Sequence, residues 1–252
     1  MEALKAGSDG QDLEKSGAGQ SELHGSKSEQ QRVGFARRLL WLVLRAIARV
    51  VMLLAFRLRT YGSTNVPERD GVILAASHQS YLDPILVTAP LRRMACFMAR
   101  RTLFRNRYFG ALIRALNAFE LDQERPDRTA LREAVGLLRS GWCLVVFPEG
   151  TRTRDGQIGP LHPGVISIAV RAGAPIVPVS IEGAFAAWPR GGGIRPHPIA
   201  VHYGRPIGSE ELRDIGREEA ALRLRQRLVE GQETLRRLMS GQVVHDFRSA
   251  GN

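Results

Sequence analysis

The sequence predicts an α/β fold with a mostly parallel central sheet flanked by helices and an amphipathic helix at its N-terminal side. Two patterns indicate this fold. From Arg59 onward, short apolar or β-branched runs alternate with longer stretches of helical character, as in parallel sheets with crossover helices. Before them lies a basic, Leu-rich segment, residues 35–58, whose arginines recur at helical spacing.

Each expected element has its own local signal. The expected strands are short, apolar or β-branched runs: Val72–Ala76, Ala95–Ala99, Cys143–Phe147, Ile176–Ile181 and Ile199–Tyr203. The expected helices between them are longer: Pro84–Leu91, Tyr108–Leu116, Arg128–Arg139 and Pro163–Ala172. A last helix over Glu210–Met239 places leucines at helical spacing among charges, which indicates packing onto the sheet.

The N-terminal part divides into a tail and a helix. Residues 1–34 are rich in Gly, Ser, Gln and charge, so we expect a disordered tail. Residues 35–58 contain five arginines and no acid, with Arg38, Arg45 and Arg49 in one narrow helical stripe. We expect this amphipathic helix to lie at a membrane interface with the stripe toward headgroup phosphates. The alternative is a buried helix of the domain, and the arginines disfavour a bilayer span.

The charge of the chain is strongly asymmetric. Residues 1–31 contain three Lys and six acidic residues and sum to −3, so the rest of the chain carries +14, with Arg as its only strong base, to give the net charge of +11. A basic body favours anionic partners, whether nucleic acid, phosphorylated ligands or an anionic membrane face. The sequence has no aromatic-interleaved basic stretch and no nucleic-acid-binding module, so we expect no nucleic-acid partner.

Several common site types are disfavoured by the residues present. Cys96 and Cys143 lie in apolar runs, which favours buried, reduced thiols in a cytosol-facing protein. Neither lies at metal-ligand spacing, so no metal site is expected. A Walker-type phosphate loop needs a Lys, and none follows Lys27. A GxSxG elbow and an HExxH pair are also absent from the sequence, which disfavours serine hydrolases and zinc proteases.

The first candidate site follows the strand expected at Val72–Ala76 and reads SHQSYLDP, Ser77–Pro84. His78 therefore lies at the carboxyl end of a strand, where open α/β sheets place active sites. Asp83 can fold back, orient the imidazole and stabilise the imidazolium while the other ring nitrogen takes a proton from a hydroxyl. The motif supplies no protein nucleophile, so the hydroxyl belongs to a substrate. In the alternative, Asp83 caps a helix that Pro84 opens.

The second candidate site reads FPEGTR, Phe147–Arg152, and also follows an expected strand. It should therefore lie on the same edge of the sheet as the first motif. Arg152 is a good bidentate partner for phosphate, and Gly150 lets a ligand approach the backbone closely. Glu149 either holds Arg152 or accepts a hydrogen bond from a substrate hydroxyl. The alternative interpretation is a turn with a surface ion pair.

HxxxxD followed by FPEGTR resembles the lysophospholipid acyltransferases, the group that includes 1-acyl-sn-glycerol-3-phosphate acyltransferase. The resemblance covers roughly Tyr61–Pro206. It implies that His78 is the general base and Asp83 its orienting partner. It also implies that four residues of the second motif bind the phosphate region of the acceptor: Glu149, Gly150, Thr151 and Arg152.

The chain departs from the family pattern between the two motifs. The family's intermediate motif ends in Asp-Arg, whereas the matching stretch here, Asn117–Gln123, has Gln123 at the Arg position. Arg125, two residues on, is the expected replacement. The family also has a basic residue, often Lys, near Arg100 and Arg101. The resemblance therefore implies substrate contacts for these three arginines as well.

The resemblance implies a complete reaction. A fatty acyl group passes from acyl-CoA or acyl carrier protein to the free hydroxyl of a lysophospholipid, with 1-acyl-glycerol-3-phosphate as the expected acceptor and phosphatidic acid as the product. No cofactor is expected. Another lysophospholipid, an aminolipid or a lipid-linked sugar remains open as the acceptor, and a non-catalytic protein that binds anionic lipid is the contrasting class.

The resemblance also completes the expected organisation of the chain. Residues 59–240 form the acyltransferase domain, and residues 241–252 form a C-terminal tail. Many family members sit on the cytosolic face of a membrane through N-terminal helices. We therefore expect a peripheral protein on the cytoplasmic face of the cell membrane.

Overall fold

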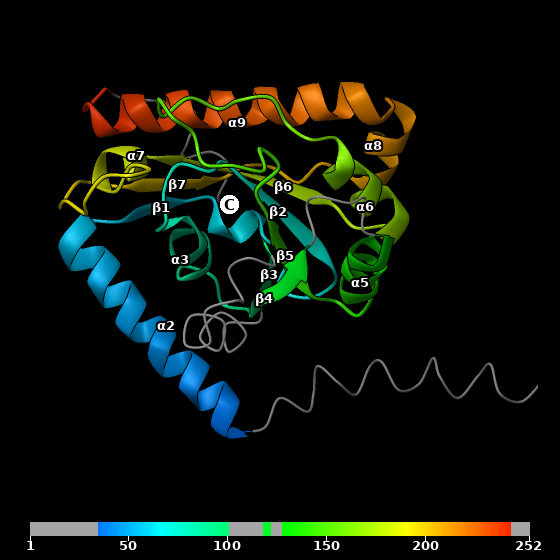
Figure 1. Ribbon diagram of the computed structural model, residues 1–252, viewed down its shortest axis with the longest axis horizontal. Coiled ribbons are helices and arrows are strands. Elements are labelled where there is room, and N and C mark those ends of the chain that lie inside the picture. Colours follow the sequence, from blue (N-terminus) through cyan, green and yellow to red (C-terminus); the bar gives the residue numbers. More distant parts are fainter. Residues whose placement is uncertain (1–34, 101–117, 122–127, 243–252) are drawn as a thin grey trace, which may run out of the picture. The chain divides into compact units, whose positions relative to one another are not determined.

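The computed structural model describes residues 35–100, 118–121 and 128–242 (Figure 1). By its internal contacts the chain divides into two units, Met1–Leu39 and Leu40–Asn252. Of the first unit, only the opening residues of helix α2 (Phe35–Phe56) are described. The sheet and the helices around it belong to the second unit. The predicted tails and the helix expected at Tyr108–Leu116 lie mainly or wholly outside the described residues.

The second unit is built on a seven-stranded sheet with the order β1-β7-β6-β2-β5-β3-β4. The strands from β6 to β4 are parallel, whereas β7 runs antiparallel to β6 and pairs in parallel with β1. Their bounds are β1 Arg59–Tyr61, β2 Val72–Ala76, β3 Ala95–Arg100, β4 Ala118–Leu121, β5 Cys143–Val146, β6 Ile176–Glu182 and β7 Ala200–Tyr203. The predicted mostly parallel sheet is confirmed.

The position of β2 explains its sequence. All five of its side chains are buried, because β2 pairs with β5 on one side and β6 on the other and is covered on both faces. Val72 and Leu74 point into one hydrophobic cluster, and Ile73 and Ala75 into the other. A strand buried on both faces has an unbroken apolar run rather than an alternating one.

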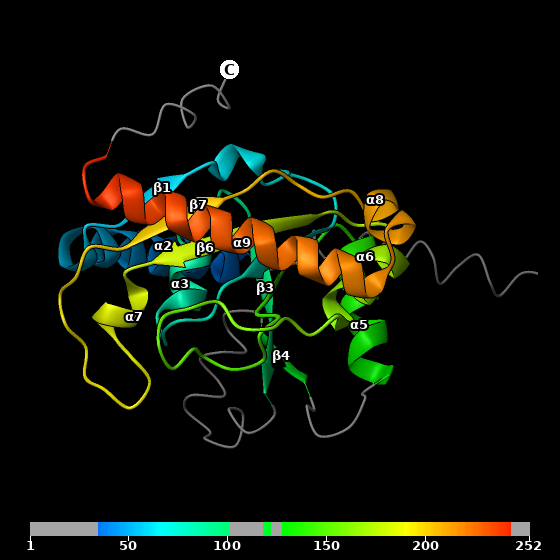
Figure 2. The same ribbon diagram turned by 90° about the horizontal axis from the view of Figure 1, so that it is seen from above.

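Helices cover the two faces of the sheet. One cluster includes residues of α3 (Asp83–Thr88), α7 (Ala184–Ala187) and the end of α2. The other includes residues of α5 (Arg128–Arg139), α6 (Gly164–Ala172), α8 (Ser209–Asp214) and α9 (Arg217–Met239). Figures 1 and 2 show α9 extended along the strands of this second face.

The single helix predicted over Glu210–Met239 is wrong. The chain forms two helices, α8 and α9, with a break at Gly216, whose φ of 82° is favourable only for Gly. The leucines of α9 do pack onto the sheet as predicted. At Gly231 the helix approaches so closely that a Cβ there would clash with Ser180 Oγ of β6.

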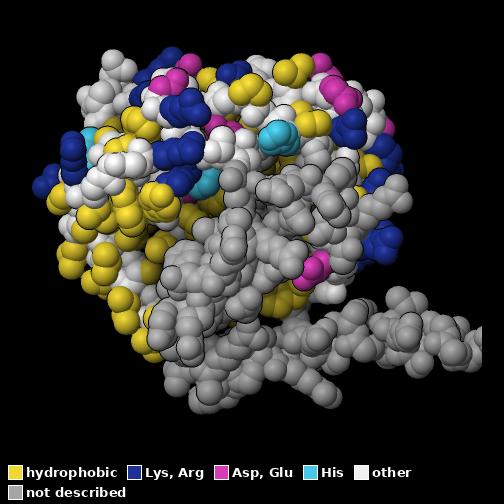
Figure 3. Space-filling view, viewed as in Figure 1, with side chains coloured by type: hydrophobic (Ala, Val, Ile, Leu, Met, Phe, Trp, Pro, Cys, Tyr) yellow, Lys and Arg dark blue, Asp and Glu magenta, His cyan; other side chains and the backbone are white. Residues whose placement is uncertain are grey.

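One arginine of helix α2, Arg45, has a different position from the one predicted. Arg45 donates a hydrogen bond to the Leu91 carbonyl, and Met52 and Phe56, on the same helical face, are buried in the domain core. The prediction that Arg45 faces headgroup phosphates is therefore wrong. The opposite face of the helix exposes apolar side chains: Leu42, Val43, Ile47, Val50, Val51, Leu53 and Leu54. In Figure 3, hydrophobic side chains gather where Figure 1 places α2.

The helix also ends earlier than expected, at Phe56 rather than residue 58. Arg57 has a positive φ of 46°, which breaks the helix, and the chain enters β1 two residues later. Within the described ranges, none of the helices is long and apolar enough to cross a membrane.

Candidate active site

The two motif loops lie at the carboxyl ends of neighbouring strands, β2 and β5, and they contact each other. The backbone N–H of His78 donates to Glu149 Oε1 at 2.8 Å. The Thr153 N–H donates to the His78 carbonyl at 2.8 Å. These two hydrogen bonds join the first loop, residues 77–84, to the second loop, residues 147–162.

His78 and Asp83 form the predicted pair. His78 Nδ1 and Asp83 Oδ2 are 2.8 Å apart, with 20% of the histidine side chain exposed and none of the aspartate. Among the described residues, His78 Nε2 has no hydrogen-bond partner. An aspartate on Nδ1 fixes the tautomer in which Nε2 carries the lone pair. The partly exposed imidazole is therefore arranged to take a proton at Nε2.

The carboxylate of Asp83 is held by the backbone that precedes it. The N–H groups of Gln79 and Ser80 donate to the same Oδ2 at 2.6 and 2.7 Å. Asp83 is the first residue of α3, and Leu82 occupies the cap position without a side-chain cap bond. The alternative in which Asp83 caps its own helix is therefore wrong. Burial raises the pKa of Asp83, whereas the donors from His78, Ser80 and Gln79 lower it.

The imidazole is also held by an aromatic side chain from the second motif. The rings of His78 and Phe147 are stacked, with centroids 4.2 Å apart and planes inclined by 23°. This stacking restricts rotation of the imidazole, which the hydrogen bond to Asp83 alone would permit. The sequence does not predict the contact, although the aromatic residue is part of the FPEGTR motif.

Glu149 has a different position from the one predicted. Its Oε1 accepts the N–H of His78, and its Oε2 accepts the N–H of Gly159 at 3.0 Å. The carboxylate therefore joins the first loop to the far part of the second, and the predicted pairing with Arg152 is wrong. Burial raises the pKa of Glu149, and these two backbone donors lower it.

Arg152 lies against an aromatic residue of the first loop. Its Cζ is 3.4 Å from the centroid of the Tyr81 ring. Within the described part of the chain its side chain makes no hydrogen bond, and Nη1 is buried without an acceptor. A guanidinium whose N–H groups have no partner in the described chain is suited to a phosphate or carboxylate ligand.

The other predicted binding residues are placed only in part. Gly150 has a φ of 69°, and a Cβ there would come within 3.1 Å of the His162 ring, so this turn requires Gly. Thr151 is exposed beside it. Arg100 ends β3 but its side chain lies outside the described part, as do Arg101 and Arg125 entirely.

Helix α9 contributes residues that the sequence does not predict for this site. Gln232 Nε2 donates to the Gly156 carbonyl at 2.9 Å, and Gln79 Nε2 donates to the same oxygen at 3.3 Å. Arg225 donates to the carbonyls of Ile158 and Gly159. These contacts fix the second loop over residues 156–159. They join segments about 70 residues apart in the chain, and no local motif signals them.

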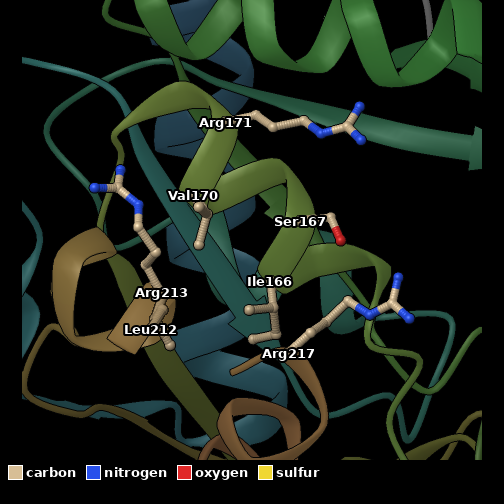
Figure 4. A pocket seen from close by; sticks show the side chains of 7 residues that line it. All are labelled: Ile166, Ser167, Val170, Arg171, Leu212, Arg213 and Arg217. Atoms are coloured by element: carbon tan, nitrogen blue, oxygen red, sulfur yellow. The ribbon is translucent and has the colours of Figure 1, made fainter. Parts of the chain in front are cut away.

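A shallow pocket lies elsewhere, between α6, α8 and the start of α9 (Figure 4). Its floor is apolar, and Arg171, Arg213 and Arg217 surround it. Arg217 already forms an ion pair with Glu218 at 2.9 Å. None of its lining residues comes from the two motif loops, so it is not part of the candidate active site.

The two serines of the first loop, Ser77 and Ser80, have hydrogen-bond partners other than His78. Ser80 Oγ donates to the Trp188 carbonyl at 3.0 Å. Ser77 Oγ accepts the N–H of Ile181 at 3.1 Å, and both serines are buried. In the described part of the chain, neither serine is bonded to His78 Nε2, which is consistent with the prediction that the attacking hydroxyl belongs to a substrate.

Comparison with known proteins agrees with this geometry. The Acyltransferase family model matches residues 57–182, half of the chain, and includes both motifs. The chain is 31% identical over 136 residues to the 1-acyl-sn-glycerol-3-phosphate acyltransferase of Bacillus subtilis, over 54% of this chain and 67% of that protein. It is 30% identical over 161 residues to the enzyme of the same name from Streptococcus pneumoniae, over 63% of this chain and 58% of that protein.

A solved structure has the same fold. The chain is similar to the 1-acyl-sn-glycerophosphate (LPA) acyltransferase PlsC from Thermotoga maritima, with a TM-score of 0.71 and 26% identity. The match covers 85% of this chain and 89% of the Thermotoga chain. The predicted family is confirmed: this chain belongs to the Acyltransferase family.

Proposed function

We propose that this acyltransferase transfers a fatty acyl group from an acyl thioester to the free hydroxyl of 1-acyl-glycerol-3-phosphate, giving phosphatidic acid. The observation that carries the proposal is the His78–Asp83 pair at 2.8 Å, with Nε2 unbonded in the described chain and Arg152 on the adjoining loop. The names of the Bacillus, Streptococcus and Thermotoga relatives support the same acceptor.

The reaction follows from the pair. His78 Nε2 takes the proton of the acceptor hydroxyl as its oxygen attacks the thioester carbonyl, and Asp83 stabilises the imidazolium. The tetrahedral intermediate then collapses with cleavage of the C–S bond. The imidazolium returns its proton to the departing thiolate, so the products are an ester and a free thiol. A positioned base of this kind contributes about 10²–10⁴-fold to the rate.

The second loop serves the acceptor phosphate. We assign the bidentate contact to Arg152, whose donors are free in the described structure. Gly150 and Thr151 allow the ligand to approach the backbone, and Glu149 acts by joining the loops rather than by touching the ligand. Arg100, Arg101 and Arg125 are proposed as further cationic contacts, from sequence position alone.

The acyl donor is either acyl-CoA or acyl carrier protein, because both present the same thioester carbonyl. No cofactor takes part in the proposed reaction, since attack, proton transfer and collapse need only the base and the thioester. A neutral lysolipid lacks the anion that Arg152 is placed to bind, so it should be a poorer acceptor than 1-acyl-glycerol-3-phosphate.

Thiol release from acyl-CoA in the presence of single lysolipids tests the proposal. The wild-type chain should release thiol with 1-acyl-glycerol-3-phosphate, and His78→Ala should lower the rate by about 10²-fold or more. His197→Gln, a histidine outside both loops, is the matched control and should remain active. Substantial activity in folded His78→Ala would overturn the base assignment. Turnover with another lysolipid but not this one would overturn the acceptor.

We infer that α2 attaches the protein peripherally to the cytoplasmic face of the cell membrane. Its exposed face carries large apolar side chains, with Leu54 75% and Leu53 59% exposed, and such a helix can lie in the interface with its apolar face in the acyl boundary. The cytoplasmic side is supported by Cys96 and Cys143, which are buried free thiols whose pKa burial raises to about 12.

Flotation with anionic phospholipid vesicles tests the membrane contact. Ile47→Ser combined with Leu54→Ser should reduce the vesicle-bound fraction several-fold, because apolar burial supplies about 25 cal/mol per Å². Leu222→Ser, which changes an equally apolar side chain that is 63% exposed on α9, is the control. Equal losses in both variants, or no loss in either, would remove α2 as the contact.

A further inference from the structure

Tyr81 contacts both the proposed phosphate ligand Arg152 and a second aromatic residue, Trp188. The guanidinium carbon of Arg152 is 3.4 Å from the Tyr81 ring centroid. The ring centroids of Tyr81 and Trp188 are 5.0 Å apart, and the ring planes are inclined by 42°. Tyr81 is 52% exposed, so core burial does not account for its position.

The ring of Tyr81 lies directly against the guanidinium of Arg152. In the described part of the chain, Arg152 makes neither an ion pair nor a side-chain hydrogen bond, and Glu149 is engaged elsewhere. A guanidinium stacked on a ring keeps its N–H donors in its own plane, where they remain available to a ligand. An acidic partner would instead occupy those donors and compete with the phosphate.

Trp188 is fixed to the first loop by hydrogen bonds. Its carbonyl accepts the hydroxyl of Ser80 at 3.0 Å, and its indole N–H donates to the Gly192 carbonyl at 3.1 Å. The N–H of Phe185, in the same segment, donates to Gln79 Oε1 at 3.2 Å. The segment from α7 to Gly192 therefore supports the Tyr81 ring from the side, and both are tied to the backbone that holds Asp83.

We propose that Tyr81, supported by Trp188, is a positioning residue that sets Arg152 for the phosphate of the acceptor. The proposal rests on the proposed function, because it takes Arg152 as the phosphate ligand. Tyr81 acts through Arg152 and does not touch the reacting atoms. Its loss should therefore weaken acceptor binding while the chemistry at His78 continues.

Steady-state kinetics with acyl-CoA and 1-acyl-glycerol-3-phosphate test this role. Tyr81→Leu keeps apolar bulk but removes the π face, and it should raise the acceptor KM about tenfold with kcat within about twofold. Tyr81→Phe keeps the π face of the ring, so its acceptor KM should stay within about twofold of the wild-type value. In an Arg152→Gln background, Tyr81→Leu should have no further effect, because the contact is already lost.

Each outcome decides one question. If wild type turns over and Tyr81→Leu leaves the KM unchanged, or raises it equally in the Arg152→Gln background, Tyr81 does not position Arg152 while the proposed function stands. If wild type releases no thiol with 1-acyl-glycerol-3-phosphate, the proposed function fails. Should Tyr81→Leu not fold, Trp188→Leu replaces it, with an expected rise in KM of about threefold. Arg152→Lys serves where the Gln background is too slow to measure.

Discussion

The two motif loops are held in place in different ways. In the first loop, the donors to Asp83 Oδ2 all come from within five residues: the ring of His78 and the N–H groups of Gln79 and Ser80. The second loop depends on distant parts of the chain. Glu149 reaches back to His78, and Gln232 reaches the Gly156 carbonyl from α9.

This difference in support matches the two proposed roles, proton transfer by the first loop and phosphate binding by the second. His78 and Asp83, the proposed base and its orienting carboxylate, pair within one turn that leads directly into α3, and only the stacked Phe147 ring comes to this pair from the second loop. The second loop, the proposed phosphate site, gains its shape from the first loop and from α9, so its position depends on tertiary packing. Changes in the first loop should therefore act on kcat, and changes in the supports of the second loop should act mainly on acceptor KM.

Of the substitutions that test this comparison, Asp83→Asn should have the largest effect on activity. The amide cannot stabilise the imidazolium, and its NH₂ group cannot accept the donors that converge on Oδ2. We expect kcat to fall about 10²–10⁴-fold, the range contributed by a positioned general base. Stopped assays at saturating 1-acyl-glycerol-3-phosphate measure this change.

The stability of the same variant provides the control. Burial raises the pKa of Asp83, so the charged carboxylate is disfavoured there and a neutral amide relieves part of that cost. We therefore expect Asp83→Asn to fold, because this gain offsets part of the loss of the backbone bonds to Oδ2, and urea unfolding measures the net change. A large loss of stability with a normal kcat would show that the pair is structural.

The same distinction explains what the sequence reveals of the fold. The unbroken apolar run of β2 and the helical spacing of α5 are local signals, and both elements have the predicted position. The edge strand β1 reads RTY and has no apolar run, so only its pairing with β7 makes it a strand. The break at Gly216 also needs the backbone, since the charge pattern continues through it.

In the site, the sequence again predicts contacts within one motif and misses contacts between distant segments. The spacing of His78 and Asp83 predicts their contact, because a turn of this length lets the carboxylate fold back toward the imidazole. The hydrogen-bond partners of Glu149 are His78 and Gly159 rather than Arg152, and they depend on the backbone path of the whole second loop. The stacking of Arg152 on Tyr81 joins residues of different loops, which the separate motifs do not indicate.

Gln232→Leu should give the smallest effect and probes the distant support of the second loop. Gln232 is buried on α9, and its loss leaves the Gly156 carbonyl with the longer bond from Gln79 alone. An incompletely satisfied buried carbonyl costs about 1 kcal/mol of folding free energy. We expect that decrease in urea unfolding, together with a rise in acceptor KM of about two- to fivefold and little change in kcat.

Gln226→Leu on the same helix is the matched control. Gln226 is exposed and bonds to Glu230 within α9, so neither stability nor KM should change appreciably. If Gln232→Leu lowers kcat as strongly as it raises KM, α9 supports the His78 loop as well. The two loops would then form one cooperative unit, and the separation between a local catalytic pair and a remotely supported anion loop would be wrong.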